Sequence, residues 1–300
     1  MTTYDVVLRG GRVIDPESGL DAVRDVAIAG DRVAAVGTGL PPGRQEADVA
    51  GQVVTAGFVD LHSHAHDVGS ARLQVAGGVT TALELEAGVT PVAAAYAAAA
   101  VTGRPLNYGF AASWTMARMA VLSGVAPDSS VESLFANLAD PGWQRAASPA
   151  EIDRVLRILE ADVADGALGI GLLVGYAPGT TPGEYVRVAA LASAGGVLTF
   201  THARDLIEFA PDGPVDGAEE IVRAAGGSGQ ESGSGTAPVQ VRGMASLAMT
   251  LPGKVRYRWM TAWSSGSSSS SCLMMASPPG SAARSSLSLA AVGTSSPVGA

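Results

Sequence analysis

The stretch Val54-Thr-Ala-Gly-Phe-Val-Asp-Leu-His-Ser-His64 decides how this chain is built. It is apolar with β-branched residues, which predicts a buried strand over residues 53–64. The strand ends on His62 and His64, and residues i and i+2 of a strand point the same way. Two imidazoles from one strand end can therefore bind one metal ion, and neutral imidazoles suit zinc. His66 follows, and we expect it beside the ligands or facing solvent rather than on the metal.

Downstream of this strand, segments typical of strands and of helices alternate along the chain. We expect further strands over residues 79–86, 106–112, 167–174 and 196–202. Helices are expected between them, one over residues 89–101 and two that begin at the capping-box sequences Ser148-Pro-Ala-Glu151 and Thr181-Pro-Gly-Glu184. Strands that alternate with helices predict a parallel α/β sheet, either open or barrel-shaped. A complete eight-fold barrel needs about 250 residues, so residues 53–225 suffice for about five βα units.

The first 52 residues indicate a smaller unit made of strands. Residues 4–9 and 12–14 read as two strands joined by a turn at Gly10-Gly11. Residues 25–29 and 32–36 repeat the pattern around Gly30-Asp31. Short strands with glycine-containing turns predict a small antiparallel β unit.

Polar residues gather where the expected strands end. His202 ends the strand at residues 196–202, and Glu84 and Glu86 end the one at residues 79–86. In parallel α/β folds the carboxyl ends of the strands form the site, so these side chains should lie near His62 and His64. Either glutamate could supply a carboxylate to a metal or remain a charge at the rim.

Composition restricts the class of protein. The chain is 47% hydrophobic and 16% charged, which is enough apolar material for a large core. Its net charge of −9 argues against a nucleic-acid partner. We expect no membrane span and no signal peptide, and a cytoplasmic location. The single cysteine, Cys272, excludes an internal disulfide and a multi-cysteine zinc site.

Residues 226–300 follow a different compositional regime. No Asp or Glu occurs after Glu231. The only lysine, Lys254, and a serine-rich run at residues 264–271 lie in this part of the chain. We expect this tail to be a disordered appendage or the product of a frame-shifted coding sequence that replaced a real C-terminal half.

The chain resembles the amidohydrolase superfamily through two N-terminal stretches. The sequence from Val54 to His64 is similar to that superfamily's first-strand signature, and Leu8-Arg-Gly-Gly-Arg-Val-Ile-Asp-Pro-Glu17 resembles its N-terminal β-sandwich segment. The match is best to the D-aminoacylase branch, in particular the N-acyl-D-glutamate deacylases. The stretches that carry it are residues 78–88, 106–109, 166–171, 175–179 and 199–204.

This resemblance implies a partial metal-dependent (β/α)8 TIM-like barrel over residues 53–225. Residues 1–52 would be the N-terminal strands of a β-sandwich, and residues 226–300 a separate tail. The resemblance implies one or two divalent ions, zinc foremost. It makes His62, His64 and His202 metal ligands, with Glu86, or less well Glu84, as the second-strand ligand. Tyr176 would face the substrate carboxylate. The implied reaction is hydrolysis of a small-molecule N-acyl-D-amino acid by metal-activated water.

The chain departs from the family pattern in its last quarter. The sixth-strand histidine ligand and the eighth-strand catalytic aspartate belong after residue 225, but no His follows His202 and no Asp follows Asp216. No catalytic base can therefore be assigned, and we expect activity impaired by several orders of magnitude. The alternatives are an inactive fragment or pseudoenzyme, and a cyclic-amide hydrolase of the dihydroorotase or hydantoinase type. That type usually carries a fourth-strand lysine, and Lys254 is the only lysine here.

Overall fold

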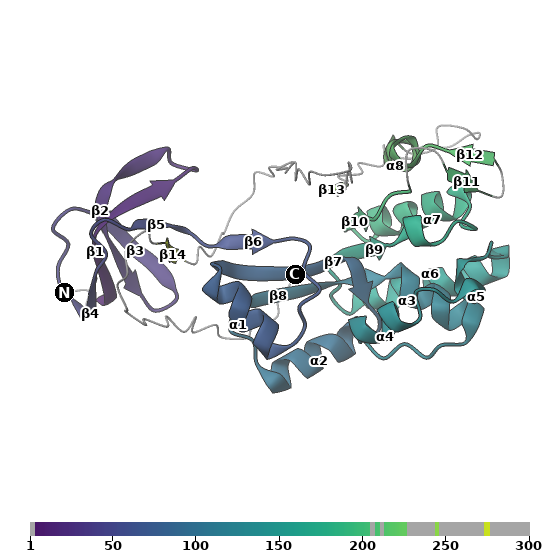
Figure 1. The fold of residues 1–300 in the computed structure, drawn as a ribbon, viewed down its shortest axis with the longest axis horizontal. Helices are drawn as coiled ribbons and strands as arrows, with labels where there is room; N and C mark the ends of the chain where they lie inside the picture. Colours follow the sequence, from purple (N-terminus) through teal and green to yellow (C-terminus); the bar gives the residue numbers. More distant parts are fainter. Residues whose placement is uncertain (1–3, 205–207, 211–212, 227–243, 246–272, 277–300) are drawn as a thin grey trace.

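The computed structural model describes residues 4–204, 208–210, 213–226, 244–245 and 273–276. Within them, a mixed sheet, here sheet A, is built mainly from the N-terminal strands. A parallel sheet, here sheet B, follows and carries most of the helices. Figure 1 shows sheet A at one end of the molecule and sheet B nearer its middle, joined by a short crossing of the chain between β5 and β6.

Sheet A agrees only in part with the expected antiparallel unit. Its strands are β1 (Tyr4–Asp15), β2 (Leu20–Ala29), β3 (Arg32–Gly37), β4 (Gly43–Asp48), β5 (Val53–Ala56) and β14 (Leu273–Ala276). The hairpin around Gly30-Asp31 is confirmed, because it joins the antiparallel pair β2 and β3. However, β1 pairs in parallel with both β4 and β5, so the sheet is mixed.

The predicted turn at Gly10-Gly11 is wrong. Strand β1 runs through this dipeptide, and its register with β2 shifts between Leu8 and Gly11. Gly10 has a φ of +70°, and its N–H donates to Oδ1 of Asp25 over 3.0 Å. The glycine pair therefore makes a bulge, with the backbone donor satisfied by a carboxylate from the neighbouring strand.

Sheet B contains the five strands expected downstream of residue 53. They are β6 (Phe58–Asp60), β7 (Val79–Val89), β8 (Asn107–Ser113), β9 (Gly169–Leu172) and β10 (Leu198–Thr201), with β13 (Met244–Ala245) beyond them. Their order in the sheet follows the chain, and every pair is parallel. This arrangement is a half-barrel, as a partial TIM-like fold requires.

The prediction of one continuous buried strand over residues 53–64 is also wrong. The chain breaks at Gly57, where a Cβ atom would lie 2.1 Å from the side chain of Thr80. Upstream, β5 belongs to sheet A; downstream, β6 belongs to sheet B. Phe58 and Val59 are 58% and 54% exposed, because β6 is the edge strand of sheet B among the described residues.

Helices follow the strands of sheet B. They are α1 (Val68–Ala76), α2 (Val92–Thr102), α6 (Pro149–Ala164), α7 (Pro182–Ala194) and α8 (Gly217–Gly226). Between β8 and α6 the chain also forms α3 (Trp114–Arg118), the π-helical turn η1 (Met119–Ser123), α4 (Val131–Ala136) and α5 (Pro141–Gln144), which the sequence pattern did not indicate. Short elements η2 (Val174–Tyr176), β11 (Glu208–Ala210) and β12 (Gly213–Val215) complete the described part. Among its helices, none has the length and apolar character needed to cross a membrane.

The two predicted capping boxes have different outcomes. At α6, Ser148 accepts from the Glu151 N–H, and the Glu151 carboxylate accepts from the Ser148 N–H, as predicted. At α7, Thr181 accepts from the Glu184 N–H. However, the Glu184 carboxylate is buried and bonds to Arg118, so the reciprocal half of this box is missing.

The main hydrophobic core lies between sheet B and its helices. Helix α6 buries Ile152, Val155 and Leu159, whose spacing places them on one helix face. Val155 and Leu159 join a cluster that includes Phe110, Trp114, Trp143, Ile170, Leu172 and Tyr185. This core fixes strands β8 and β9, and so the wall of the half-barrel that carries the polar strand ends.

Most of the serine-rich tail, and with it the choice between disorder and a frame shift, lies outside the described residues. Two short parts of it are described. Strand β13 pairs in parallel with β10, and β14 pairs antiparallel with β5.

Candidate metal centre

Three strand ends bring the polar residues together. His62 and His64 lie two and four residues after the end of β6, where the Asp60 carboxylate accepts from the His62 N–H over 3.1 Å. Glu86 lies near the end of β7, and His202 follows β10. Carboxyl ends of parallel strands share one edge of the sheet, so residues far apart in sequence meet there.

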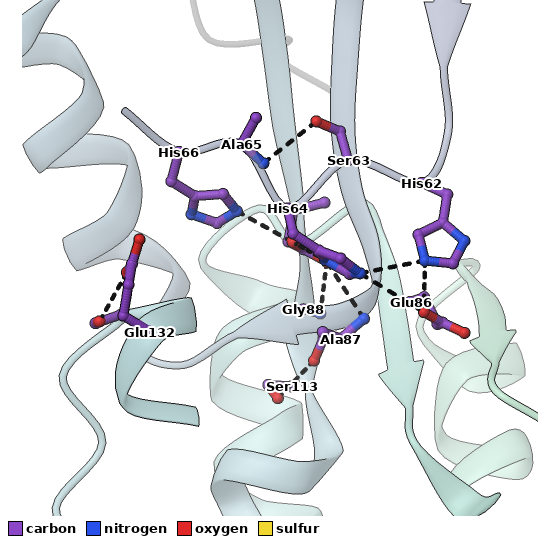
Figure 2. Close-up of polar contacts among 12 residues, drawn as sticks. His62, Ser63, His64, Ala65, His66, Glu86, Ala87, Gly88, Ser113 and Glu132 are labelled. Atoms are coloured by element: carbon purple, nitrogen blue, oxygen red, sulfur yellow. Dashed lines mark hydrogen bonds and ion pairs between the residues drawn. The ribbon is translucent and has the colours of Figure 1, made fainter. Parts of the chain in front are cut away.

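His62, His64 and Glu86 form a group that could hold a metal ion. The Nε2 atoms of the two histidines lie 3.2 Å apart. Oε2 of Glu86 lies 2.7 Å from Nε2 of His62 and 3.8 Å from Nε2 of His64. All three ligand atoms lie within 4.8 Å of one another. Figure 2 shows both imidazoles and the carboxylate directed to one region. Two nitrogens and one oxygen form a ligand set that fits zinc.

Electrostatics favour a cation at this position. Burial of Glu86 tends to raise its pKa, but hydrogen bonds from His202 and His62 outweigh this and lower it to about 2. The pKa of His62 is raised, mainly by its hydrogen bond to Glu86. Glu86 is therefore a buried anion at neutral pH, and a metal ion could replace the positive charge that protonation of His62 supplies beside it.

His202 reaches the same carboxylate from the opposite side. Its Nδ1 lies 2.8 Å from Oε1 of Glu86, whereas His62 faces Oε2. The His202 N–H donates to the carbonyl of Leu172 over 2.8 Å, which fixes the backbone at the end of β10. Tyr176 lies beside it, with ring centroids 4.8 Å apart and its side chain partly exposed. The structure thus places His202 next to the group of three rather than within it.

Glu84 lies behind His64. Its Oε2 is 2.7 Å from Nδ1 of His64 and 3.1 Å from Nε2 of His66, and its Oε1 accepts from the Ala87 and Gly88 N–H groups over 3.3 Å. Burial opposes ionisation of Glu84, yet the bonds from both histidines keep its pKa below the ordinary value. An ionised carboxylate only accepts, so Nδ1 of His64 carries the hydrogen. In the neutral imidazole of His64 the lone pair is then on Nε2, which lies 3.2 Å from Nε2 of His62 and 3.8 Å from Oε2 of Glu86.

Two contributors to the site were not predicted. The ring of Phe135 on α4 meets that of His64 edge-on, with centroids 5.4 Å apart. Gly171 on β9 lies so close to β7 that a Cβ atom would come within 2.5 Å of the Glu86 carbonyl oxygen. Neither position carries a local sequence signal, because each acts only through tertiary packing.

Comparisons with known proteins identify the family. No family model matches the chain. The D-aminoacylase of Alcaligenes xylosoxydans xylosoxydans is 30% identical over 216 residues, which cover 67% of this chain and 45% of that protein. A crystal structure of D-aminoacylase superposes with a TM-score of 0.55 at 24% identity, covering 67% of this chain and 46% of that one. This chain is a D-aminoacylase homologue of the amidohydrolase superfamily.

Two further relatives were found, one by structure and one by sequence. The N-acyl-D-glutamate deacylase from Bordetella bronchiseptica, solved with zinc and a phosphonate inhibitor, gives a TM-score of 0.60 at 23% identity, covering 76% of this chain and 50% of that one. A dihydroorotase of Citrifermentans bemidjiense is 40% identical over 88 residues, 26% of this chain and 21% of that protein. This chain thus spans about half the length of the D-aminoacylases that it matches. The resemblance expected from the Val54–His64 stretch is confirmed.

Proposed function

We propose that this chain is a zinc-dependent amidohydrolase acting on the amide bond of N-acyl-D-amino acids, with N-acyl-D-glutamate as the reference substrate. The observation that carries the proposal is the convergence of His62 Nε2, His64 Nε2 and Glu86 Oε2 within 4.8 Å. These atoms lie at strand ends of a half-barrel, in a chain that is similar to D-aminoacylase. The carboxylate that the proposal needs as a ligand is buried and ionised at neutral pH.

The residues divide into separate roles. His62, His64 and Glu86 would hold the ion, and Oε1 of Glu86 with Nδ1 of His202 offers a second position beside it. A bound zinc ion supplies Lewis-acid activation of the amide carbonyl and of water. Tyr176, partly exposed and packed on the His202 ring, is proposed to donate from its hydroxyl to the substrate carboxylate.

We also propose that hydrolysis by this chain is slow. The resemblance implies a histidine ligand and a catalytic aspartate after residue 225, where this chain has no histidine and no aspartate. Loss of an aligned proton acceptor alone costs about 10²–10⁴ in rate. Metal binding, which needs only the described strand ends, should survive this loss better than turnover.

A cyclic-amide substrate is the second candidate. It is favoured by the local similarity to dihydroorotases, at 40% identity over 88 residues. The lysine content argues against it. Enzymes of that type usually carry a lysine on the fourth strand, and the only lysine of this chain is Lys254. We therefore rank it below the acyclic amide.

The test is a substrate comparison on the zinc-loaded chain. N-acetyl-D-glutamate, its L enantiomer and dihydroorotate are incubated separately, and released amine or ring-opened product is quantified. The proposal expects release from the D enantiomer only, above a metal-free control. Ring opening of dihydroorotate without amide hydrolysis would favour the second candidate. Zinc binding without any turnover would identify an inactive fragment.

A further inference from the structure

His66 lies outside the proposed ligand set, yet it shares a carboxylate oxygen with one of its members. Its Nε2 lies 3.1 Å from Oε2 of Glu84, the atom that is 2.7 Å from Nδ1 of His64. The His66 ring is largely buried and packs near Phe110, with centroids 5.4 Å apart. Figure 2 shows His66 and His62 on opposite sides of His64.

The shared oxygen gives His66 an influence on His64. Glu84 is 2% exposed, and a buried carboxylate depends on its hydrogen-bond donors both for its charge and for its rotamer. Its Oε1 is held by two backbone N–H groups at 3.3 Å, which are long bonds. Its Oε2 is held by imidazoles alone among the described contacts. Removing the His66 donor would leave the position of Oε2 set by His64 itself.

We propose that His66 is a positioning residue for the metal centre. By donating from Nε2 to Glu84, it fixes the carboxylate that keeps His64 in the Nδ1–H tautomer with its Nε2 lone pair facing Glu86. This inference rests on the proposed function, because it concerns the same centre. Carboxylates that fix the tautomer of a metal-binding histidine are a general device, and their own partners control how firmly they do so.

A purely structural role for His66 would be to anchor the loop after β6. That loop has two other anchors: the Ser63 N–H donates to the Leu83 carbonyl over 3.1 Å, and Nε2 of Gln74 donates to Oγ of Ser63 over 2.8 Å. Gln74 therefore provides a matched control. Gln74→Leu removes a loop anchor without touching the Glu84 bonds, whereas His66→Phe removes the donor but keeps a ring against Phe110.

The first test reads the tautomer directly in the metal-free full-length chain. The chain has four histidines, so ¹⁵N-histidine labelling gives four rings, and His64→Gln assigns the His64 signals. We expect the Nδ1–H tautomer for His64 in the parent chain, in Gln74→Leu and in His66→Gln, whose side-chain amide can still donate. In His66→Phe we expect a mixture of tautomers.

The second test is the zinc affinity of the same variants, measured by competition with a chromophoric chelator. His66→Phe should weaken zinc binding about 10–100-fold, and His66→Gln should restore most of it. The inference is overturned if His66→Phe leaves both the tautomer and the affinity unchanged, or if Gln74→Leu shifts them equally. A parent chain that binds no zinc but shows the tautomer effect would overturn the proposed function and leave the positioning of His64 standing.

Discussion

Glu86 on β7 and His202 at the end of β10 meet through Oε1 and Nδ1 at 2.8 Å, although β8 and β9 lie between their strands in sheet B. In a flat sheet, strands three positions apart are separated by about 14 Å. The contact therefore requires sheet B to curve, as the wall of a barrel does, with both side chains on its concave face. The neighbouring strands β6 and β7 bring His62, His64 and Glu86 together, and curvature of the sheet adds His202.

The first prediction ranks the ligands. Glu86→Gln should weaken zinc binding at least about 100-fold, because it removes the anion that faces both imidazoles. His202→Asn should cost about tenfold or less for the first ion, since His202 contacts the carboxylate from outside the group of three. Chelator-competition titrations measure both. Equal losses in the two variants would place His202 in the first site and contradict this ranking.

A second prediction concerns the buried ion pair that supports the wall. Arg118 and Glu184 are fully buried and paired at 2.5 Å, and Nε1 of Trp114 also donates to Glu184. Glu184→Gln leaves the Arg118 charge without its counterion, so the free energy of unfolding should fall by about 3–5 kcal/mol. Urea denaturation measures the loss.

The matched control for that pair is on the surface. Arg187 and Asp153 are paired at 2.6 Å but are both roughly half exposed. Arg187→Gln should change the free energy of unfolding by less than about 1 kcal/mol. A similar effect of the two substitutions would mean that burial does not decide the strength of these pairs.

A third prediction uses the close approach of β9 to β7. Gly171→Ala would bring a Cβ atom to 2.4 Å from the Leu85 carbonyl oxygen and 2.5 Å from that of Glu86, so the strands must separate. We expect a loss of stability of about 1–3 kcal/mol and weaker zinc binding, because Glu86 moves with its backbone. Gly183→Ala in α7 meets nothing closer than 3.9 Å and should stabilise the protein by roughly 0.5 kcal/mol. Unaltered zinc affinity in Gly171→Ala would separate Glu86 from the centre.

The fourth prediction is a pH dependence of stability. Asp162 is buried and accepts from the Val92 N–H over 2.8 Å and from Oγ1 of Thr90 over 2.7 Å. Burial raises its pKa above the ordinary 3.8 despite these bonds. A raised carboxyl pKa contributes stability that is complete below the ordinary value and is lost as the pH rises through the folded-state pKa.

The check compares the parent chain with Asp162→Asn, which cannot ionise. The free energy of unfolding of the parent chain, minus that of the variant, should be largest near pH 3.5 and decline toward pH 7. Urea denaturation at a series of pH values measures this difference. A difference that grows with pH would mean that the Asp162 carboxylate is stabilised, not destabilised, by its surroundings.

Features that depend on local sequence could be predicted. Strands β7, β8, β9 and β10 of sheet B, the capping box at Ser148 and the hairpin at Gly30-Asp31 follow from short-range periodicity and turn chemistry. The Gly10-Gly11 turn was wrong because a glycine pair suits a bulge as well as a turn. The break at Gly57 was missed because it depends on how closely Thr80 packs against the crossing between the sheets.

The site divides in the same way. Period-two spacing places Glu84 and Glu86 on one face of β7, so the sequence could not separate the proposed ligand from the proposed orienting carboxylate. The distinction comes from tertiary geometry: His64 presents Nδ1 to Glu84 and Nε2 toward Glu86. The contact of Phe135 with His64 depends on the helical segment between β8 and α6, for which the sequence offered no strong pattern.

The most direct test of the central claim is zinc X-ray absorption spectroscopy on the full-length chain loaded with one equivalent of zinc. The account predicts two imidazole nitrogens and at least one carboxylate oxygen at about 2.0–2.2 Å, with one imidazole lost in His64→Gln. A zinc ion surrounded by water oxygens alone, or an environment unchanged in both His62→Gln and His64→Gln, would contradict it.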